Sequence, residues 1–397
     1  MSYRKFQATH LFTGTEMLDT DHVLITTDDG TIEAIVDKKD AGEAIQQLTG
    51  ILTPGFINCH CHLELSHMKG LIPEQTGLVD FVFKVVNERH FPEEEILDAI
   101  ASAEEEMLEN GIVAVGDICN NTTTLPQKKL QRLAYYNFIE VSGWLPDVAQ
   151  IRFERSMRFY EVFGEKVKLQ TPNSKLLTSL SPHAPYSVSN DLWELISPHF
   201  ENKTVTIHNQ ETSFEDALFE KGEGDFNRMY GMMNLDTSFF QPTGKSSLQS
   251  YLHKLDKAKQ VLLVHNTFTK EADVSYVNSE SSVVSWCVCI NANLYIEKAV
   301  PPVDMFRKNN CQLVIGTDSL ASNTSLGVLD EMKTITKYFP HIPLTELLQW
   351  ATSNGAKALQ MNDQLGNFEK GKKPGVLILE NIENNRVTEM SVVRRVL

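Results

Sequence analysis

Residues 56–67 read FINCHCHLELSH, and this stretch places two kinds of metal-binding side chain in alternation. Successive side chains of a β-strand point to opposite faces. We therefore expect His60 and His62 to share one face of a strand, and Cys59 and Cys61 to share the other. Because apolar residues lead into the segment, it predicts a buried strand that ends in a pair of histidines.

Similar apolar runs recur along the chain, and stretches of helical character separate them. There are about eight runs, which is the number that a (β/α)₈ barrel requires. They cover residues 51–62, 111–119, 133–144, 175–183, 204–208, 260–267, 282–290 and 312–318. We predict an α/β protein with a (β/α)₈ TIM-like barrel over residues 53–364. Residues 1–52 and 365–397 are rich in short strand-like runs, so we expect both termini to form one small β-sandwich domain.

Two local patterns support this division of the chain. Residues 91–111, FPEEEILDAIASAEEEMLENG, repeat apolar residues at helical spacing between an initial proline and a final glycine. Residues 23–36, VLITTDDGTIEAIV, are two strand-like runs joined at an Asp-Gly step, which is typical of a hairpin.

Composition limits the partners of this chain. Its 397 residues include 36 basic and 52 acidic side chains, for a net charge of −16, which argues against binding to nucleic acid or to an anionic membrane. We find no signal peptide and no apolar run of about 18 residues that would span a membrane. Six cysteines in so long a chain do not suggest a disulfide framework. We expect a reduced cytoplasmic protein with a small-molecule substrate, and a homodimer would be compatible with these features.

Histidine or aspartate residues lie at the ends of several of the apolar runs. In a barrel enzyme, the active site lies at the carboxyl ends of the strands. Imidazole and carboxylate groups are good ligands for Zn²⁺, with Fe²⁺ as an alternative. Glu211 follows closely enough to act as a general acid and base at such a metal, although a glutamate at a helix start is also common. The residues at the run ends are His60, His62, His183, His208, His265 and Asp318.

The cysteines offer a competing metal site. Cys287 and Cys289 repeat the alternating pattern of Cys59 and Cys61, so four thiolates could in principle hold zinc. Their strands would be the first and seventh of the ring, which are not neighbours. We therefore interpret the cysteines as small buried hydrophobic residues on the outer face of the barrel.

These residues together resemble the amidohydrolase superfamily, in its subgroup of metal-dependent aminohydrolases. The resemblance rests on LTPGFINCHCH, SPHAPYS, HNQE, VHNT, GTDSLASN and EKGKKPGVLIL, which extend over nearly the whole chain. It implies that His60, His62, His208 and Asp318 hold one divalent metal ion, since the end of the fourth run lacks the lysine of binuclear relatives. It also implies that Glu211 is the proton shuttle. His265, with Asp318, would orient the attacking water, and His183 would contact the substrate.

The resemblance is closest to the branch of aminofutalosine deaminases and triazine hydrolases. It implies a hydrolytic deaminase that releases ammonia from an amino-substituted heteroaromatic ring, with a 6-aminopurine nucleoside such as aminofutalosine as the leading substrate. A chloro- or aminotriazine hydrolase, a cyclic amidohydrolase and a non-catalytic binding protein are the alternatives. Glu64, Asn293 and Arg155 are the expected substrate contacts, and Arg152 and Arg158 are further candidates for binding a carboxylate.

Overall fold

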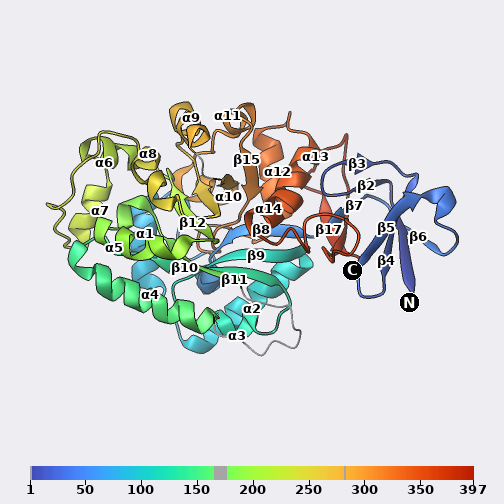
Figure 1. Ribbon diagram of the computed structural model, residues 1–397, viewed down its shortest axis with the longest axis horizontal. Coiled ribbons are helices and arrows are strands. Elements are labelled where there is room, and N and C mark those ends of the chain that lie inside the picture. Colours follow the sequence, from blue (N-terminus) through green and yellow to red (C-terminus); the bar gives the residue numbers. More distant parts are fainter. Residues whose placement is uncertain (1, 165–176, 281–282) are drawn as a thin grey trace.

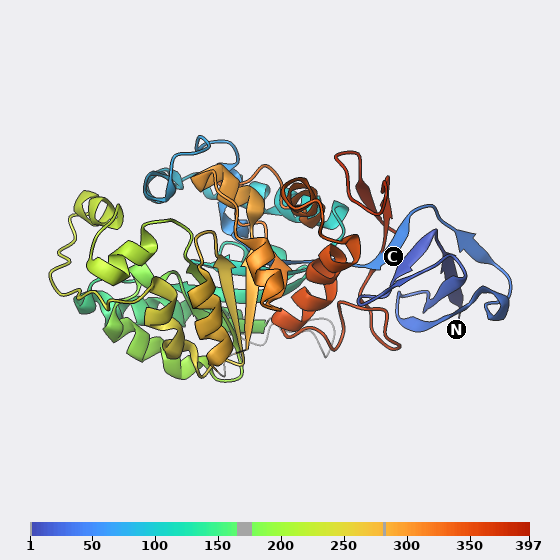
Figure 2. The same cartoon turned by 90° about the horizontal axis from the view of Figure 1, so that it is seen from above.

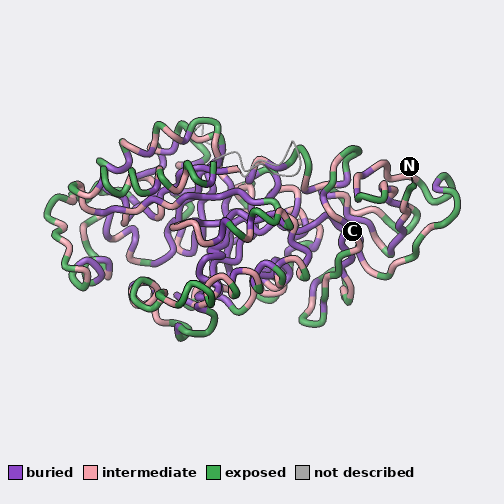
Figure 3. The backbone as a smooth tube through the Cα atoms, turned by 90° about the horizontal axis from the view of Figure 1, so that it is seen from below, coloured by how far each residue is buried: buried purple, intermediate pink, exposed green. Residues whose placement is uncertain are grey.

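The computed structural model describes residues 2–164, 177–280 and 283–397. It is elongated, with a large α/β part at one end and a smaller part made mainly of strands at the other (Figures 1 and 2). Both termini lie in the smaller part (Figure 1). Buried backbone is concentrated among the strands of the large part, whereas most exposed segments lie at its periphery (Figure 3).

Eight parallel strands form the centre of the large part, in two sheets of four. The sheet orders are β11-β10-β9-β8 and β12-β13-β14-β15, so neighbouring strands follow one another along the chain. The strands are β8 (Phe56–Cys61), β9 (Ile112–Cys119), β10 (Ala134–Val141), β11 (Leu177–Pro182), β12 (Thr204–Asn209), β13 (Gln260–His265), β14 (Val284–Val288) and β15 (Gln312–Ile315). The two sheets are fully consistent with the predicted α/β class.

Seven of the predicted runs correspond to one strand each. Residues 175–176 of the fourth run and residue 282 of the seventh lie outside the described residues. The first run differs, because residues 51–62 contain two strands rather than one. β7 (Ile51–Pro54) pairs antiparallel with a C-terminal strand, and only β8 joins the parallel sheet.

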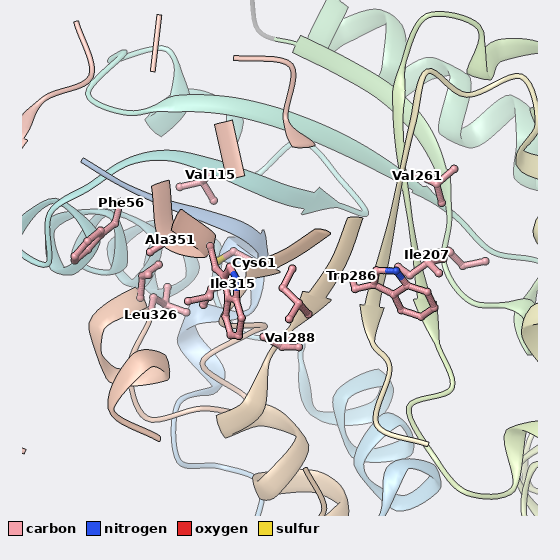
Figure 4. Close-up of a cluster of buried hydrophobic side chains, with 14 of the residues drawn as sticks. Phe56, Cys61, Val115, Ile207, Val261, Trp286, Val288, Ile315, Leu326 and Ala351 are labelled. Atoms are coloured by element: carbon pink, nitrogen blue, oxygen red, sulfur yellow. The ribbon is translucent and has the colours of Figure 1, made fainter. Parts of the chain in front are cut away.

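Helices follow the parallel strands and pack on their outer faces. Their apolar sides join one large core with the outward side chains of the strands, including Val115, Ile207, Trp286 and Ile315 (Figure 4). The predicted helix is confirmed as α2. The helices are α1 (Leu78–Glu88), α2 (Glu93–Glu109), α3 (Leu125–Lys128), α4 (Ala149–Gly164), α5 (Asn190–Ile196), α6 (Glu215–Lys221), α7 (Phe226–Met232), α8 (Ser247–Tyr251), α9 (Glu271–Ser279), α10 (Ile290–Glu297), α11 (Val303–Lys308), α12 (Val328–Tyr338), α13 (Leu344–Gln349) and α14 (Gly355–Ala358).

The small part consists of two further sheets that contain strands from both ends of the chain. One has the order β5-β4-β1-β6 and the other β17-β16-β7-β2-β3. Apolar side chains from both sheets, such as Phe6, Leu24 and Ile378, form one shared cluster. The predicted hairpin is confirmed as β4 and β5. The strands are β1 (Tyr3–Gln7), β2 (His10–Phe12), β3 (Met17–Leu18), β4 (His22–Thr27), β5 (Ile32–Asp37), β6 (Ile45–Gln47), β7, β16 (Val376–Glu380) and β17 (Val392–Arg395).

Within the described residues, the helices are all too short or too polar to cross a membrane.

Candidate active site

Three histidines and an aspartate meet at the carboxyl ends of β8, β12 and β15. The Nε2 atoms of His60 and His62 lie 3.2 Å apart. Asp318 Oδ1 lies 3.6 Å from His60 Nε2 and 3.3 Å from His62 Nε2. The ring centroid of His208 lies 5.0 Å from that of His60. Strands far apart in sequence thus bring the four predicted ligands to one point.

The backbone around Asp318 is held in an unusual conformation. Its φ angle is +59°, and that of His265 is +72°, a region that residues other than glycine seldom adopt. Such strain persists only where neighbouring contacts enforce it. The N–H groups of Thr317 and Asp318 donate to the carbonyl of His60 at 3.0 Å, and Ser322 Oγ donates to Asp318 Oδ2 at 2.6 Å. These bonds aim the carboxylate at the histidines.

The histidines present unprotonated nitrogens, as metal ligands must. Burial, with the neighbouring histidines, lowers the pKa of His62 to about 3. Burial also lowers the pKa of His60 and that of His208 below the ordinary histidine value. His208 Nδ1 donates to the carbonyl of His183 at 2.7 Å, which leaves the Nε2 lone pair available. His60, His62 and Asp318 have ligand atoms spaced closely enough to share a cation, and His60 belongs to a second such group with His208 and His265. Buried, unprotonated imidazoles beside a carboxylate suit a divalent cation such as Zn²⁺.

Glu211 lies beside this cluster. Its Oε1 is 3.6 Å from His265 Nε2, and both side chains are almost fully buried. Burial, and then the nearby Asp318, raise the pKa of Glu211 well above its ordinary value. The N–H groups of Gln210 and Glu211 donate to Glu215 at 2.9 and 3.4 Å, which fixes the turn that carries Glu211.

Asn293 does not occupy the position expected of a substrate contact. Among the described residues it is absent from the cavity wall, and its side chain is buried behind His265. Its Oδ1 accepts a hydrogen bond from His265 Nδ1 at 2.7 Å. This bond places the proton of the imidazole on Nδ1, so the buried Nε2 keeps a lone pair and has no other hydrogen-bond partner. The sequence alone did not predict this supporting role.

A cavity of about 790 Å³ opens over the cluster. His183, Glu64 and Arg155, three of the predicted substrate contacts, line it, whereas Arg158 does not. Glu64 is not free to take a cation from the substrate, because Arg89 already pairs with it at 2.8 Å. Arg152 and Arg155 extend into the same wall from α4. Apolar side chains of α1 and α7 form much of the remaining wall, including Leu78, Phe81, Val82 and Met229.

Glu140 at the end of β10 is a cavity residue that sequence reasoning missed. Asn120 donates to its Oε2 at 2.7 Å, while its Oε1 has no hydrogen-bond partner and lies 3.9 Å from His208 Nδ1. Burial raises the pKa of Glu140 to about 7. Its place at the end of the third apolar run was the available signal, the same one that identified His183 on the next strand.

The predicted positions of the cysteines are partly wrong. Cys61 lies on the helix side of its strand, but Cys59 belongs to the cluster between the two sheets, together with Cys287 and Cys289. The register of β8 against β9 shifts between Asn58 and Cys61, which breaks strict alternation. The cysteines are nevertheless free, and these four are buried. The three groups of described side chains whose spacing suits a metal contain no cysteine.

Known proteins share the fold and about a quarter or less of the sequence. A 5′-deoxyadenosine deaminase of Methanosphaera stadtmanae is 24% identical over 393 residues, which span 92% of this chain and 82% of that protein. The aminofutalosine deaminase of Helicobacter pylori, solved with methylthio-coformycin, superposes with a TM-score of 0.78 at 23% identity, over 96% of this chain and 93% of that one. The zinc complex of an atrazine chlorohydrolase of Arthrobacter aurescens superposes with a TM-score of 0.73 at 16% identity, over 98% of this chain and 91% of that one. The amidohydrolase family model matches residues 51–394, and the chain accordingly belongs to the amidohydrolase family, whose members are hydrolases.

Proposed function

We propose that this protein is a metal-dependent hydrolytic deaminase of amino-substituted heteroaromatic rings. Water replaces the amino group on a ring carbon, so that an oxo product and ammonia result. The observation that carries the proposal is the position of Glu211, a buried carboxyl group 3.6 Å from His265 and beside the candidate metal ligands, where burial raises its pKa well above the ordinary value. A hydrolase of amides has no comparable need for a proton donor directed at an aromatic ring nitrogen. The names of the relatives agree with this reaction.

His60, His62, His208 and Asp318 would hold one divalent ion, with Zn²⁺ favoured. When bound, such an ion lowers the pKa of a water molecule towards about 7 and so supplies a nucleophile at neutral pH. The end of β11 reads Ser181-Pro182-His183, without a lysine that could bridge two ions, which supports a single ion.

The proton transfers belong to Glu211 and His265. Glu211 first donates its proton to the ring nitrogen next to the amino-bearing carbon, which makes that carbon electrophilic. His265, held by Asn293, directs its free Nε2 lone pair at the attacking water, and the Asp318 carboxylate accepts a hydrogen bond from the same water. The deprotonated Glu211 takes one proton from the attacking water and passes it to the amine, which leaves as ammonia while the carbonyl forms. The second proton of the water moves through His265 Nε2 to Glu211 Oε1, 3.6 Å away, and restores the starting acid.

The finer architecture supports placing the reaction at one end of a barrel. We assign a closed (β/α)₈ barrel to residues 53–364, with residues 1–52 and 365–397 forming a β-sandwich domain. Main-chain hydrogen bonds join the sheets at both seams, from His208 N to His183 O at 2.9 Å and from Thr317 N to His60 O at 3.0 Å. The carboxyl ends of all eight strands would then encircle the metal-binding side chains.

The preferred substrate is a 6-aminopurine nucleoside with a bulky 5′ substituent, as in aminofutalosine. A cavity of about 790 Å³ has room for such a molecule. The apolar side chains of α1 and α7 would cover the 5′ substituent, and His183 would contact the nucleoside near the metal. Arg155 would bind a carboxylate at the far end of the substrate. Its Nη2 lies 3.5 Å from the carbonyl of Asn120, beside the cavity wall at β9.

Product analysis of a substrate panel tests the proposal, with ammonia release measured for the purines, chloride release for the chlorotriazine and ring opening for the cyclic amide. The panel contains aminofutalosine, 5′-deoxyadenosine, adenosine, a chlorotriazine and a cyclic amide. We expect turnover of the purines and none of the cyclic amide. Arg155→Gln should raise KM for aminofutalosine about 10- to 100-fold, because a charge-assisted hydrogen bond is lost, and should leave adenosine almost unaffected.

Arg158→Gln is the matched control, since Arg158 lies on the same helix but outside the cavity wall. It should leave KM unchanged for both purines. Activity confined to chlorotriazines or to cyclic amides would refute the substrate assignment. Equal effects of Arg155→Gln on aminofutalosine and adenosine would refute the role of Arg155.

A further inference from the structure

A buried ion pair lies outside the cavity, on the helix side of the parallel strands. Lys128 Nζ of α3 is 2.5 Å from Asp117 Oδ2 of β9, and both side chains are fully buried. Neither residue lines the cavity. Lys128 also lies 5.0 Å above the ring of Tyr135 and 5.1 Å above that of Phe163. The proposed chemistry uses none of these groups.

The Asp117 oxygen that does not contact Lys128 binds the backbone of the residue that follows His62, a candidate metal ligand. Asp117 Oδ1 accepts a hydrogen bond from the backbone N–H of Leu63 at 2.8 Å, and Leu63 follows His62. Leu63 is fully buried, so without Asp117 its N–H would face an apolar core. The carboxylate therefore determines where the chain turns as it leaves β8.

Lys128 anchors the carboxylate to the rest of the sheet. Its Nζ donates to Asn137 Oδ1 of β10 at 2.7 Å, and Asn137 Nδ2 donates to the carbonyl of Leu177 of β11 at 3.2 Å. Four neighbouring strands are thus tied to the turn after His62. Hydrogen bonds are directional, so these contacts fix the orientation of the Asp117 carboxylate. Apolar packing at the same place would not fix an orientation.

Stability alone does not account for such a pair. Removing two charges from water costs several kcal/mol each, and apolar side chains of similar volume are often as stabilising or more so. What an apolar replacement cannot supply is an acceptor for the Leu63 N–H. That acceptor is the specific contribution of Asp117.

We propose that Asp117, held in place by Lys128, is a positioning residue that orients His62 for metal binding. The proposal rests on the metal site of the proposed function. Its hydrogen bond to the Leu63 N–H sets the path of the backbone after His62, and through it the direction of the imidazole. Groups that orient metal ligands in this way typically change metal affinity by about 10- to 100-fold when they are removed.

Two double variants separate positioning from packing. Asp117→Asn with Lys128→Met removes both charges but keeps an amide oxygen that can accept from the Leu63 N–H. Asp117→Leu with Lys128→Met removes the charges and the acceptor. Zn²⁺ dissociation constants are measured by competition with a chelator, and unfolding by denaturant is measured alongside. We expect the asparagine variant to bind Zn²⁺ slightly more weakly than the unmodified protein, because the acceptor for the Leu63 N–H remains but Lys128 no longer holds it. We expect the leucine variant to bind Zn²⁺ about 10- to 100-fold more weakly.

Glu104→Gln serves as the matched control. Glu104 is another fully buried carboxylate of the helix layer, bonded to Tyr135, but without a bond to the turn after His62. It should leave the zinc affinity unchanged even where stability falls. Equal zinc affinity of the two double variants, whether strong or weak, would overturn the proposal while leaving the deaminase assignment intact. Failure of the unmodified protein to bind any divalent ion would instead overturn both.

Amide hydrogen exchange gives a second test that needs no variant. The Leu63 amide of the metal-free protein should exchange slowly, because its acceptor is in place before the metal arrives. Exchange at the rate of an open loop would overturn the proposal even if the leucine variant failed to fold.

Discussion

Two buried clusters lie next to each other in the parallel sheets, and only one of them is suited to binding a metal. One consists of His60, His62, His208 and Asp318, which lie close to one another, and the other of Cys59, Cys287 and Cys289. They nearly touch at Gly316, where an added Cβ would lie 2.8 Å from His60 Cβ and 2.8 and 2.9 Å from the sulfurs of Cys287 and Cys289. The lack of a side chain at Gly316 lets the two clusters approach this closely.

The clusters differ in what surrounds their polar atoms. The histidine nitrogens face a carboxylate and a cavity, so they can share a cation. The thiols are packed among Ile57, Val264 and Val314, and burial raises the pKa of Cys59 and of Cys289 well above the ordinary value. Cysteine binds metals as the thiolate, so these thiols are poor ligands. The comparison shows that residue type identifies a potential ligand, whereas the surroundings decide whether it can act as one.

Removing a ligand from the histidine cluster should have the largest effect. We expect His208→Ala or Asp318→Ala to lose bound metal, and with it all turnover. The loss of affinity should exceed the factor of about 10–100 that loss of a supporting hydrogen bond causes. Elemental analysis of the purified variants gives the metal content, and the unmodified protein should contain one equivalent.

His183→Ala is the matched control for this prediction. Its ring lines the cavity but is outside the proposed ligand set, and its carbonyl still accepts from His208 Nδ1. It should retain the metal. Two equivalents in the unmodified protein, or full retention after loss of His208, would contradict the single-ion assignment.

Glu211→Gln should have the next largest effect, on rate rather than on metal. Loss of a general acid and base usually slows turnover about 10²- to 10⁴-fold. If Glu211 only favoured the start of α6, the cost would be below about 1 kcal/mol of stability and turnover would hardly change. Ammonia release is measured with metal content as a check, and Glu220→Gln on the same helix should behave as the unmodified protein. A metal-replete Glu211→Gln protein with normal turnover would exclude the mechanism.

The two cysteines of β8, Cys59 in the thiol cluster and Cys61 on the helix side, should matter only for packing. Cys59→Ala combined with Cys61→Ala should leave metal content intact and lower the free energy of unfolding by about 1–3 kcal/mol, through the small cavities that remain. Denaturant unfolding and elemental analysis measure the two effects. Cys59→Ala alone should already retain the metal, although Cys59 lies on the side of the sheet that faces the histidine cluster. Metal loss from a folded variant would contradict the interpretation that these cysteines serve packing and do not support the metal site.

The smallest effect should be a fall in stability of the metal-free protein between pH 7 and pH 8. Burial raises the pKa of Glu331 and of Glu215 from 4.5 to about 8 each. In that range the unfolded chain has ionised both groups, whereas the native state retains their protons. Unfolding therefore releases protons, and rising pH favours it by up to about 1 kcal/mol per group and pH unit.

Histidines add little to this slope, because they are mostly unprotonated in the unfolded chain above pH 7. Glu331→Gln removes one contribution and should flatten the pH dependence of the denaturant midpoint. A slope that is unchanged in Glu331→Gln would show that its carboxyl group does not hold a proton in the native state.

Local patterns predicted much of the fold and of the histidine cluster. The spacing of Ile100, Ala103 and Met107 indicated α2, because a helix brings such residues to one face. Histidines at the ends of apolar runs indicated the site, because the carboxyl ends of parallel strands meet at one edge. The side to which Cys59 points was not predictable in this way, since the register shift in β8 depends on its pairing with β9.

By itself, then, the sequence determined which segments are strands or helices and which side chains can bind a metal, since these depend on neighbours within a few residues. The tertiary structure decided which of those side chains meet. It placed Asn293 behind His265, brought Glu140 into the cavity wall, and paired β7 with β16 rather than with the strand that follows it. It also buried Asp117 against Lys128 and the turn after His62. Each of these contacts joins residues distant in sequence or depends on a sheet pairing, so the geometry of the whole chain, and not a local propensity, determines them.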